Sequence, residues 1–151
     1  MGFEVRNGPS DSGEGQININ PSLGYKSIDA GTWVLAVSAS HYSYAYWYNS
    51  TSAQNDAVTY NAYLAKGTYT LGLLSQTNNN EGIITVKIDG VSVGTIDLYS
   101  AGIVRNVRSL LTGIPITESK LYEIQLIMAT KNGASSSYQC VLNDIELWRT
   151  A

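Results

Sequence analysis

The stretch GIITVKIDGVSVGTIDLYS, residues 82–100, decides the fold class of this chain. Its first half alternates apolar and polar residues and places Ile84, Val86 and Ile88 on one side, which is typical of a half-buried β-strand. The Asp-Gly pair at residues 89–90 favours a two-residue hairpin turn, because both central residues of such a turn need a positive φ. The stretch therefore predicts two antiparallel strands joined by a tight turn.

The second strand of this hairpin is predicted to bend. Its apolar residues fall at positions 91 and 93 and then at 96 and 98, so the side that they occupy changes across Gly94. A slip of one residue at a glycine indicates a β-bulge, which bends a strand locally.

Similar alternation runs through most of the chain after residue 31. It occurs in residues 32–39, 56–64, 68–75 and 120–130, and residues 138–148 are expected to form the last strand. Residues 103–111 favour a strand over a short helix, because β-branched residues are frequent among them. We predict an all-β fold, an antiparallel β-sandwich of two sheets with jelly-roll-like connections. The residues expected on the inner faces include Trp33, Leu35, Val58, Tyr60, Tyr69, Leu71, Ile84, Val86, Ile88, Ile124, Leu126 and Leu147.

Composition fits one globular domain. The chain has 151 residues, of which 44% are hydrophobic and only 14% are charged, as in a β-rich domain with many turns. The single cysteine, Cys140, excludes an intramolecular disulfide and paired-thiol metal sites. The net charge of −3 gives no basis for nucleic-acid binding. Residues 1–15 lack the pattern of a signal peptide and no segment has the apolar length of a membrane helix, so we expect synthesis in a cytosol and no membrane insertion.

Residues 1–30 are expected to form an irregular N-terminal arm ahead of a sandwich at residues 31–151. They contain two of the three prolines and show no sustained periodicity. Such a segment buries little apolar surface on its own, so we expect it to make assembly contacts rather than to belong to the core. Only the patch QININP, residues 16–21, has the character of a short edge strand.

A longer pattern resembles a known family. The run DAVTYNAYLAKGTYTLGLLSQTNNNEGIITVKIDGVSVGTIDLYS is followed at a distance by LYEIQLIMATKN and LNDIELWRT. This order, with a GTY-like turn, a strand ending in DG and a late strand containing DI, resembles the galactose-binding-like β-sandwich of carbohydrate-binding modules and of domains in phage virion appendages. The resemblance covers residues 56–149 and implies the sandwich fold.

The resemblance also raises the question of a metal. In many domains of that family, acidic residues near the first strand and an Asp in the final strand hold a structural calcium. Asp144 matches the late position, but the early strand here, GTWVLAVSA, has no acidic pair. Because calcium takes about six or more oxygen ligands, we expect no metal and no other cofactor.

No pattern of catalytic residues stands out. His41 is the only histidine, so any Ser-His-Asp or Cys-His arrangement would have to include it. Acidic residues could supply a glycosidase pair, but Asp89 is explained by its turn, and Glu123 and Glu146 by outward-facing strand positions. We therefore do not expect an enzyme.

The stretch HYSYAYWYNST, residues 41–51, carries aromatic side chains on both faces if it is extended. One face can belong to the core, whereas tyrosine hydroxyls find partners more readily at a rim or interface. The polar loop NSTSAQND follows at once. We predict a contact with another subunit or with a glycan, and the alternative is an aromatic scaffold strand without a partner. The predicted contact residues are Tyr44, Tyr46, Trp47, Tyr48, Asn55 and Asp56.

Two classes of function follow from these patterns. We favour a non-enzymatic virion protein, a phage capsid decoration or tail-appendage sandwich that is made in the host cytoplasm and sits on the virion surface. Its partners would be other virion proteins, in a symmetric oligomer, and also a host-surface glycan. The alternative is an extracellular carbohydrate-binding module of a secreted or cell-surface protein, in which aromatic faces stack on sugars while Asn, Gln and Asp supply hydrogen bonds.

Overall fold

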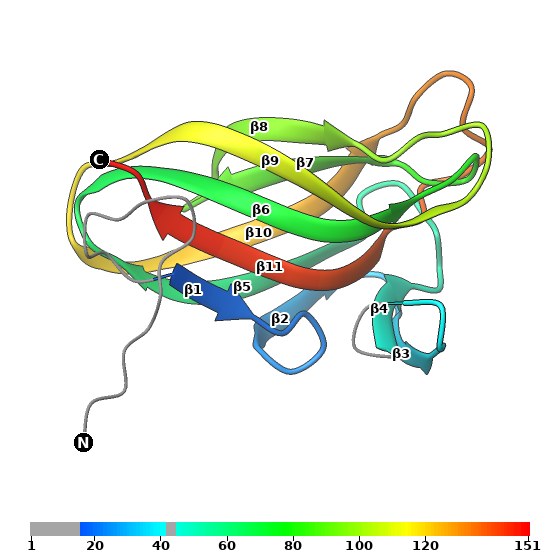
Figure 1. The fold of residues 1–151 in the computed structure, drawn as a ribbon, viewed down its shortest axis with the longest axis horizontal. Helices are drawn as coiled ribbons and strands as arrows, with labels where there is room; N and C mark the ends of the chain where they lie inside the picture. Colours follow the sequence, from blue (N-terminus) through cyan, green and yellow to red (C-terminus); the bar gives the residue numbers. More distant parts are fainter. Residues whose placement is uncertain (1–15, 42–44) are drawn as a thin grey trace.

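The computed structural model describes residues 16–41 and 45–151. Every regular element within these ranges is a β-strand, so they contain no helix that is long and apolar enough to cross a membrane. The strands form two antiparallel sheets that pack face to face (Figure 1). They are β1 (Gln16–Ile19), β2 (Tyr25–Ala30), β3 (Trp33–Val37), β4 (Ala45–Asn49), β5 (Ala57–Leu64), β6 (Gly67–Thr77), β7 (Ile83–Ile88), β8 (Val91–Asp97), β9 (Val104–Ile116), β10 (Lys120–Thr130) and β11 (Val141–Arg149).

The order of the strands explains how distant segments meet. In the first sheet the order is β3-β4-β11-β6-β9, and β1 also pairs with β11. In the second sheet the order is β2-β5-β10-β7-β8. The chain therefore passes repeatedly between the sheets, and this confirms the predicted all-β sandwich.

The β7–β8 hairpin has the predicted turn and the predicted bulge. Asp89 and Gly90 have φ values of 47° and 81°, the positive values that a tight hairpin turn requires. Val86 pairs with Gly94 whereas the next residue, Lys87, pairs with Ser92. One residue of β8 is thus extra, and the slip lies beside Gly94 as the parity change indicates.

The core lies between the two sheets, where alternate side chains of both inner faces interdigitate. In the second sheet, Leu126 of β10 lies opposite Val58 on one neighbouring strand and Val86 on the other. All three side chains are buried. Of the residues predicted to face inward, every one except Leu35 is buried.

The prediction for Leu35 is wrong. Its side chain is 51% exposed, although it lies on the same side of β3 as the buried Trp33. β3 is the edge strand of the first sheet, and at this position Leu35 borders a small surface cavity rather than the sandwich interior. Alternation along a strand gives the face of a residue, whereas burial depends on what covers that face.

Residues 16–30 belong to the sandwich and not to an arm. β1 pairs with the C-terminal half of β11, and β2 pairs with β5 at the edge of the other sheet. Ile19 is buried, and the carbonyl of Pro21 accepts a hydrogen bond from the buried Tyr60 hydroxyl at 2.8 Å. The boundary predicted at residue 30 is therefore too late, because these short strands are held by pairing with distant segments. Residues 1–15 lie outside the described residues, and the assembly contacts expected of them stay a prediction.

Candidate functional site

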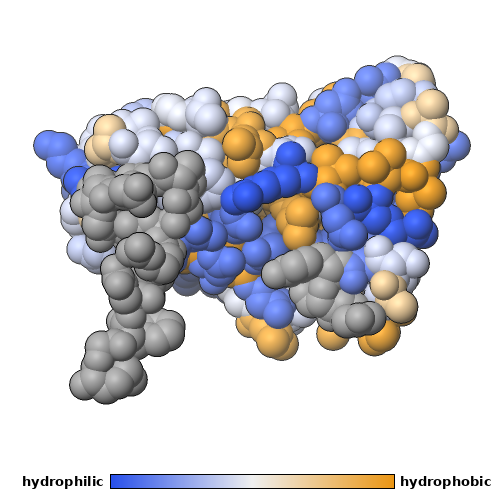
Figure 2. Space-filling model, viewed as in Figure 1, coloured by the Kyte–Doolittle hydropathy of each residue, from blue (hydrophilic) through white to orange (hydrophobic). Residues whose placement is uncertain are grey.

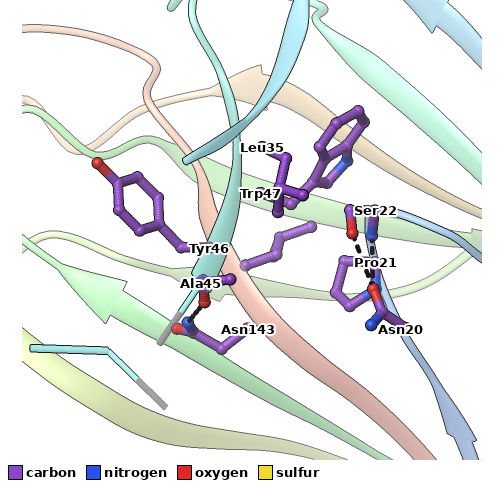
Figure 3. A pocket seen from close by; sticks show the side chains of 9 residues that line it. Asn20, Pro21, Ser22, Leu35, Ala45, Tyr46, Trp47 and Asn143 are labelled. Atoms are coloured by element: carbon purple, nitrogen blue, oxygen red, sulfur yellow. Dashed lines mark hydrogen bonds between the residues drawn. The ribbon is translucent and has the colours of Figure 1, made fainter. Parts of the chain in front are cut away.

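Strand β4 carries the aromatic stretch that the sequence singles out. It lies between β3 and the first residues of β11. Trp47 and Asn49 point into the molecule and are buried, whereas Tyr46 and Tyr48 point to the outer side of the sheet and are half-buried. Figure 3 shows Tyr46 and Trp47 on opposite sides of the strand. The predicted division of this stretch into two faces is thus present in the described part of it.

Tyr46 and Tyr48 line a cavity of about 310 Å³ on the outer side of the first sheet. This volume lies at the lower end of the range of small-molecule sites. Figure 2 views the molecule from the side of the first sheet, where polar and apolar groups are mixed on the surface. The cavity spans the sheet from β4 across β11 and β6 to the start of β9. Its lining residues are Ser38, His41, Tyr46, Tyr48, Gln76, Ile103, Arg105, Gln139 and Val141.

The aromatic side of the cavity is held in place by ring contacts. The rings of Tyr46 and Tyr48 are 5.5 Å apart and tilted by 42°. The imidazole of His41 stacks on Tyr46 with its centroid at 4.3 Å. An aromatic surface of this kind presents apolar ring faces together with polar hydroxyl groups.

A chain of hydrogen bonds lies beneath the cavity. Nε2 of His41 is 3.1 Å from Oε1 of Gln76, and Nε2 of Gln76 donates to Oε1 of Glu81 at 2.9 Å. Because the amide nitrogen of Gln76 donates to Glu81, its oxygen is left to accept from His41, so we assign the imidazole proton to Nε2. This chain fixes the orientation of the Gln76 amide in the floor of the cavity.

Glu81 is the buried end of this chain. Its side chain is fully buried, and burial raises the pKa of its carboxyl from 4.5 to about 8, against the opposing effect of the hydrogen bond from Gln76. Burial likewise lowers the pKa of His41, although its hydrogen bond with Gln76 acts in the other direction. Both groups are therefore predominantly uncharged at pH 7.

The sequence did not single out the polar residues of the cavity that carry amide or guanidinium groups. Gln76 comes from β6, Arg105 from β9, and Gln139 from the segment before β11. Oε1 of Gln139 accepts a hydrogen bond from the amide of Asn80 at 3.0 Å. These residues are far apart in the sequence and belong to no motif, so only the strand order brings them together.

Trp47 does not lie on the predicted contact surface. Its indole is only 7% exposed and is stacked between Tyr25, with centroids at 5.6 Å, and Trp33, at 6.1 Å. A side chain enclosed in this way stabilises the packing of the two sheets and is not available to a partner. Tyr44, which was predicted beside it, lies outside the described residues.

Asp56 and Asn55 do not line the cavity either. Asp56 is buried, and its Oδ2 accepts hydrogen bonds from Asn49, Thr51 and the backbone of Ala53, at 2.8, 2.7 and 2.9 Å respectively. Asn55 is exposed and has a positive φ of 69°. Both residues therefore shape the loop between β4 and β5. From the sequence alone, polar residues with this structural role look the same as polar residues that bind a ligand.

A second cavity, drawn in Figure 3, is too small for an organic ligand. It measures about 40 Å³ and lies where β1 and β4 each pair with a different half of β11 (Figure 3). Asn143, between these halves, donates to the carbonyl of Ala45 at 2.9 Å, and its Oδ1 has no partner among the described residues. A polar gap of this size fits an ordered water molecule rather than a ligand.

A third cavity, of about 490 Å³, lies between the β7–β8 turn and the end of β9. Its lining is mainly aliphatic, and its aromatic residue is Tyr122. The ammonium group of Lys120 lies 4.9 Å from the centre of that ring, and the Tyr122 hydroxyl donates to the carbonyl of Glu118. This mainly aliphatic cavity is therefore less suited to a polar ligand than the tyrosine-lined cavity.

The calcium position suggested by the family resemblance does not fit a metal. Oδ2 of Asp144 is 3.2 Å from the side-chain nitrogen of Asn18, which is a donor and not a ligand. The described residues contain no group of three or more His, Cys, Asp or Glu side chains that could hold a metal ion. Burial, followed by the neighbouring Glu146, raises the pKa of Asp144 to about 6.

Comparison with known proteins finds similarity in structure but not in sequence. No protein-family model matches the sequence, and no curated protein matches it either. A xanthan lyase from Paenibacillus has a TM-score of 0.74 at 19% identity over 89% of this chain, and the chain spans 13% of that much longer enzyme.

Two similar structures are separate modules. The CBM36-1 domain of a multidomain xylanase from the hindgut metagenome of Trinervitermes trinervoides has a TM-score of 0.61 and 17% identity, covering 87% of this chain and 95% of that one. CsCBM6-3 from Clostridium stercorarium, solved in complex with cellobiose, has a TM-score of 0.61 and 14% identity, covering 89% and 94%. The described part of the chain therefore has the β-sandwich fold of carbohydrate-binding modules.

Proposed function

We propose that this chain is a non-catalytic carbohydrate-binding module and that its sugar lies in the tyrosine-lined cavity. The observation that carries the proposal is the pairing of Tyr46 and Tyr48 with the amide groups of Gln76 and Gln139 in one cavity on this fold. Sugar rings have apolar faces that pack against aromatic rings, and their hydroxyl groups need directional hydrogen-bond partners. The cavity supplies both kinds of contact.

This proposal takes the place of the virion hypothesis that the sequence favoured. The similar structures named above are a polysaccharide lyase and two carbohydrate-binding modules. Since identity is low, the likeness supports the fold, and the glycan assignment rests on the cavity itself. We accordingly propose an extracellular or cell-surface location, with a glycan as partner. A symmetric oligomer with virion proteins stays a prediction of the first hypothesis.

Replacing Tyr46 and Tyr48 together by alanine is expected to weaken sugar binding by a factor of ten or more. The change removes the aromatic surface of the cavity, and loss of a central aromatic contact commonly lowers binding free energy by about 2 kcal/mol or more. Binding would be measured by calorimetry against neutral and acidic oligosaccharides, with thermal unfolding as a check that the variant remains folded.

The matched control is Tyr63→Ala. Tyr63 lies on β5 of the other sheet and is 60% exposed, so its loss should leave binding unchanged. A wild-type chain that binds no oligosaccharide, or a double variant that binds as well as the wild type, would overturn the assignment. Light scattering on the same samples separates the two hypotheses, because a carbohydrate-binding module is expected to be monomeric and a virion appendage a closed oligomer.

A further inference from the structure

Among the described residues that line the tyrosine-lined cavity, Arg105 has the one charged side chain. It is exposed, and it takes part in no ion pair within the described part of the chain. The neighbouring basic residue on β9, Arg108, is by contrast paired with Glu146. Among residues 16–41 and 45–151 the guanidinium group of Arg105 therefore has no carboxylate partner, and it can interact with a ligand.

No negative charge opposes Arg105 within the described cavity. None of the described lining residues is Asp or Glu. The carboxyl beneath the floor is that of Glu81, and burial keeps it predominantly protonated at pH 7. Among the described lining residues the full charge at pH 7 is thus the positive charge of Arg105, although the chain as a whole carries a net charge of −3.

The position of Arg105 relative to the tyrosines matters as much as its charge. Tyr46 and Tyr48 lie on β4, whereas Arg105 lies on β9, and strands β11 and β6 separate them in the sheet. A ligand that fills the cavity therefore meets an aromatic surface at one end, the amide of Gln76 in the middle and a guanidinium group at the other end. Such an arrangement can bind a molecule that has both an apolar ring face and an anionic group.

We propose that the cavity selects a sugar that carries an anionic group, as a uronic acid does, and that Arg105 binds this group. This inference rests on the proposed glycan-binding function and specifies its ligand. Guanidinium groups bind carboxylates through two parallel hydrogen bonds, which gives strength and fixes orientation. A sulfate ester on a sugar is also an anionic group that can accept hydrogen bonds from a guanidinium group. The ligands in the test distinguish a carboxylate from a sulfate ester.

The test compares oligogalacturonate with its methyl ester, which has the same sugar backbone without the charge. A sulfated galactan oligosaccharide and a neutral xylo-oligosaccharide complete the panel. We expect the free acid to bind about tenfold or more tightly than its ester, because hydrogen bonds to charged groups are among the strongest in proteins. The preference should shrink when the salt concentration is raised from about 50 mM to about 500 mM.

Arg105→Gln should remove this preference, so that the variant binds the free acid and its methyl ester with equal affinity. Arg105→Lys should keep part of it, since lysine retains the charge without the paired donors. The matched control is Arg108→Gln, which lies on the same strand but does not line the cavity. Tighter binding of the sulfated ligand through Arg105 would support the inference and identify a sulfate ester as the anion.

The outcomes separate this inference from the proposed function. If acid and ester bind equally, or if Arg105→Gln has no effect while the double tyrosine variant loses binding, then the anionic specificity is wrong and glycan binding stands. If the wild-type chain binds none of the four ligands, both proposals fail.

Discussion

Replacing Leu126 by alanine is expected to lower the free energy of unfolding by about 2 to 5 kcal/mol. Leu126 lies in the middle of β10, is 1% exposed, and sits between Val58 and Val86 on the two adjacent strands. Alanine would remove apolar area from the interior and leave a cavity that close-packed neighbours cannot fill. Chemical denaturation followed by intrinsic fluorescence would measure the change.

Leu121→Ala is the matched control for this experiment. It makes the same chemical change on the same strand, but Leu121 is 60% exposed, and its truncation should alter stability by about 0.5 kcal/mol or less. Equal losses for the two variants would mean that the assignment of inner and outer faces on β10 is incorrect.

Stability is also expected to fall as the pH rises from about 4.5 to about 8, because of Glu81. The pKa of this carboxyl is raised from 4.5 to about 8 in the folded chain, so the folded state holds a proton that the unfolded chain has already released. A carboxyl group whose pKa is raised by folding contributes most to the stability of the folded state at a pH below its pKa in the unfolded chain. This contribution is lost as the pH approaches its pKa in the folded chain. Integrated over this window, the change is on the order of 3 to 5 kcal/mol.

Glu81→Gln isolates this contribution from those of other titrating groups. Glutamine retains an oxygen that can accept from Gln76 but carries no charge at any pH. The variant should be more stable than the wild type at pH 9 and lack most of the wild-type pH dependence in denaturation curves recorded from pH 5 to pH 9. The control is Glu123→Gln on the surface of β10, and a parallel pH dependence in wild type and Glu81→Gln would show that Glu81 is ionised in the folded state.

The strands and their faces could largely be predicted from the sequence, because they depend on local rules. Alternation with a period of two specified the inner faces, and the Asp89-Gly90 pair specified the turn through its need for positive φ. The slip at Gly94 indicated a bulge for the same local reason. Where burial depended on distant partners, local rules failed, as for Leu35 at a sheet edge and for residues 16–30, whose strands are held by β11 and β5.

The tyrosines of β4 marked the candidate site in the sequence, but the sequence did not determine which of its aromatic residues were available. Trp47 is enclosed by rings from β2 and β3, whereas Tyr46 and Tyr48 remain in the cavity. The polar half of the site was decided by the tertiary structure alone. Gln76, Arg105 and Gln139 become neighbours of the tyrosines only because β6, β9 and β11 follow β4 across one sheet, an order set by long-range pairing that no local pattern encodes.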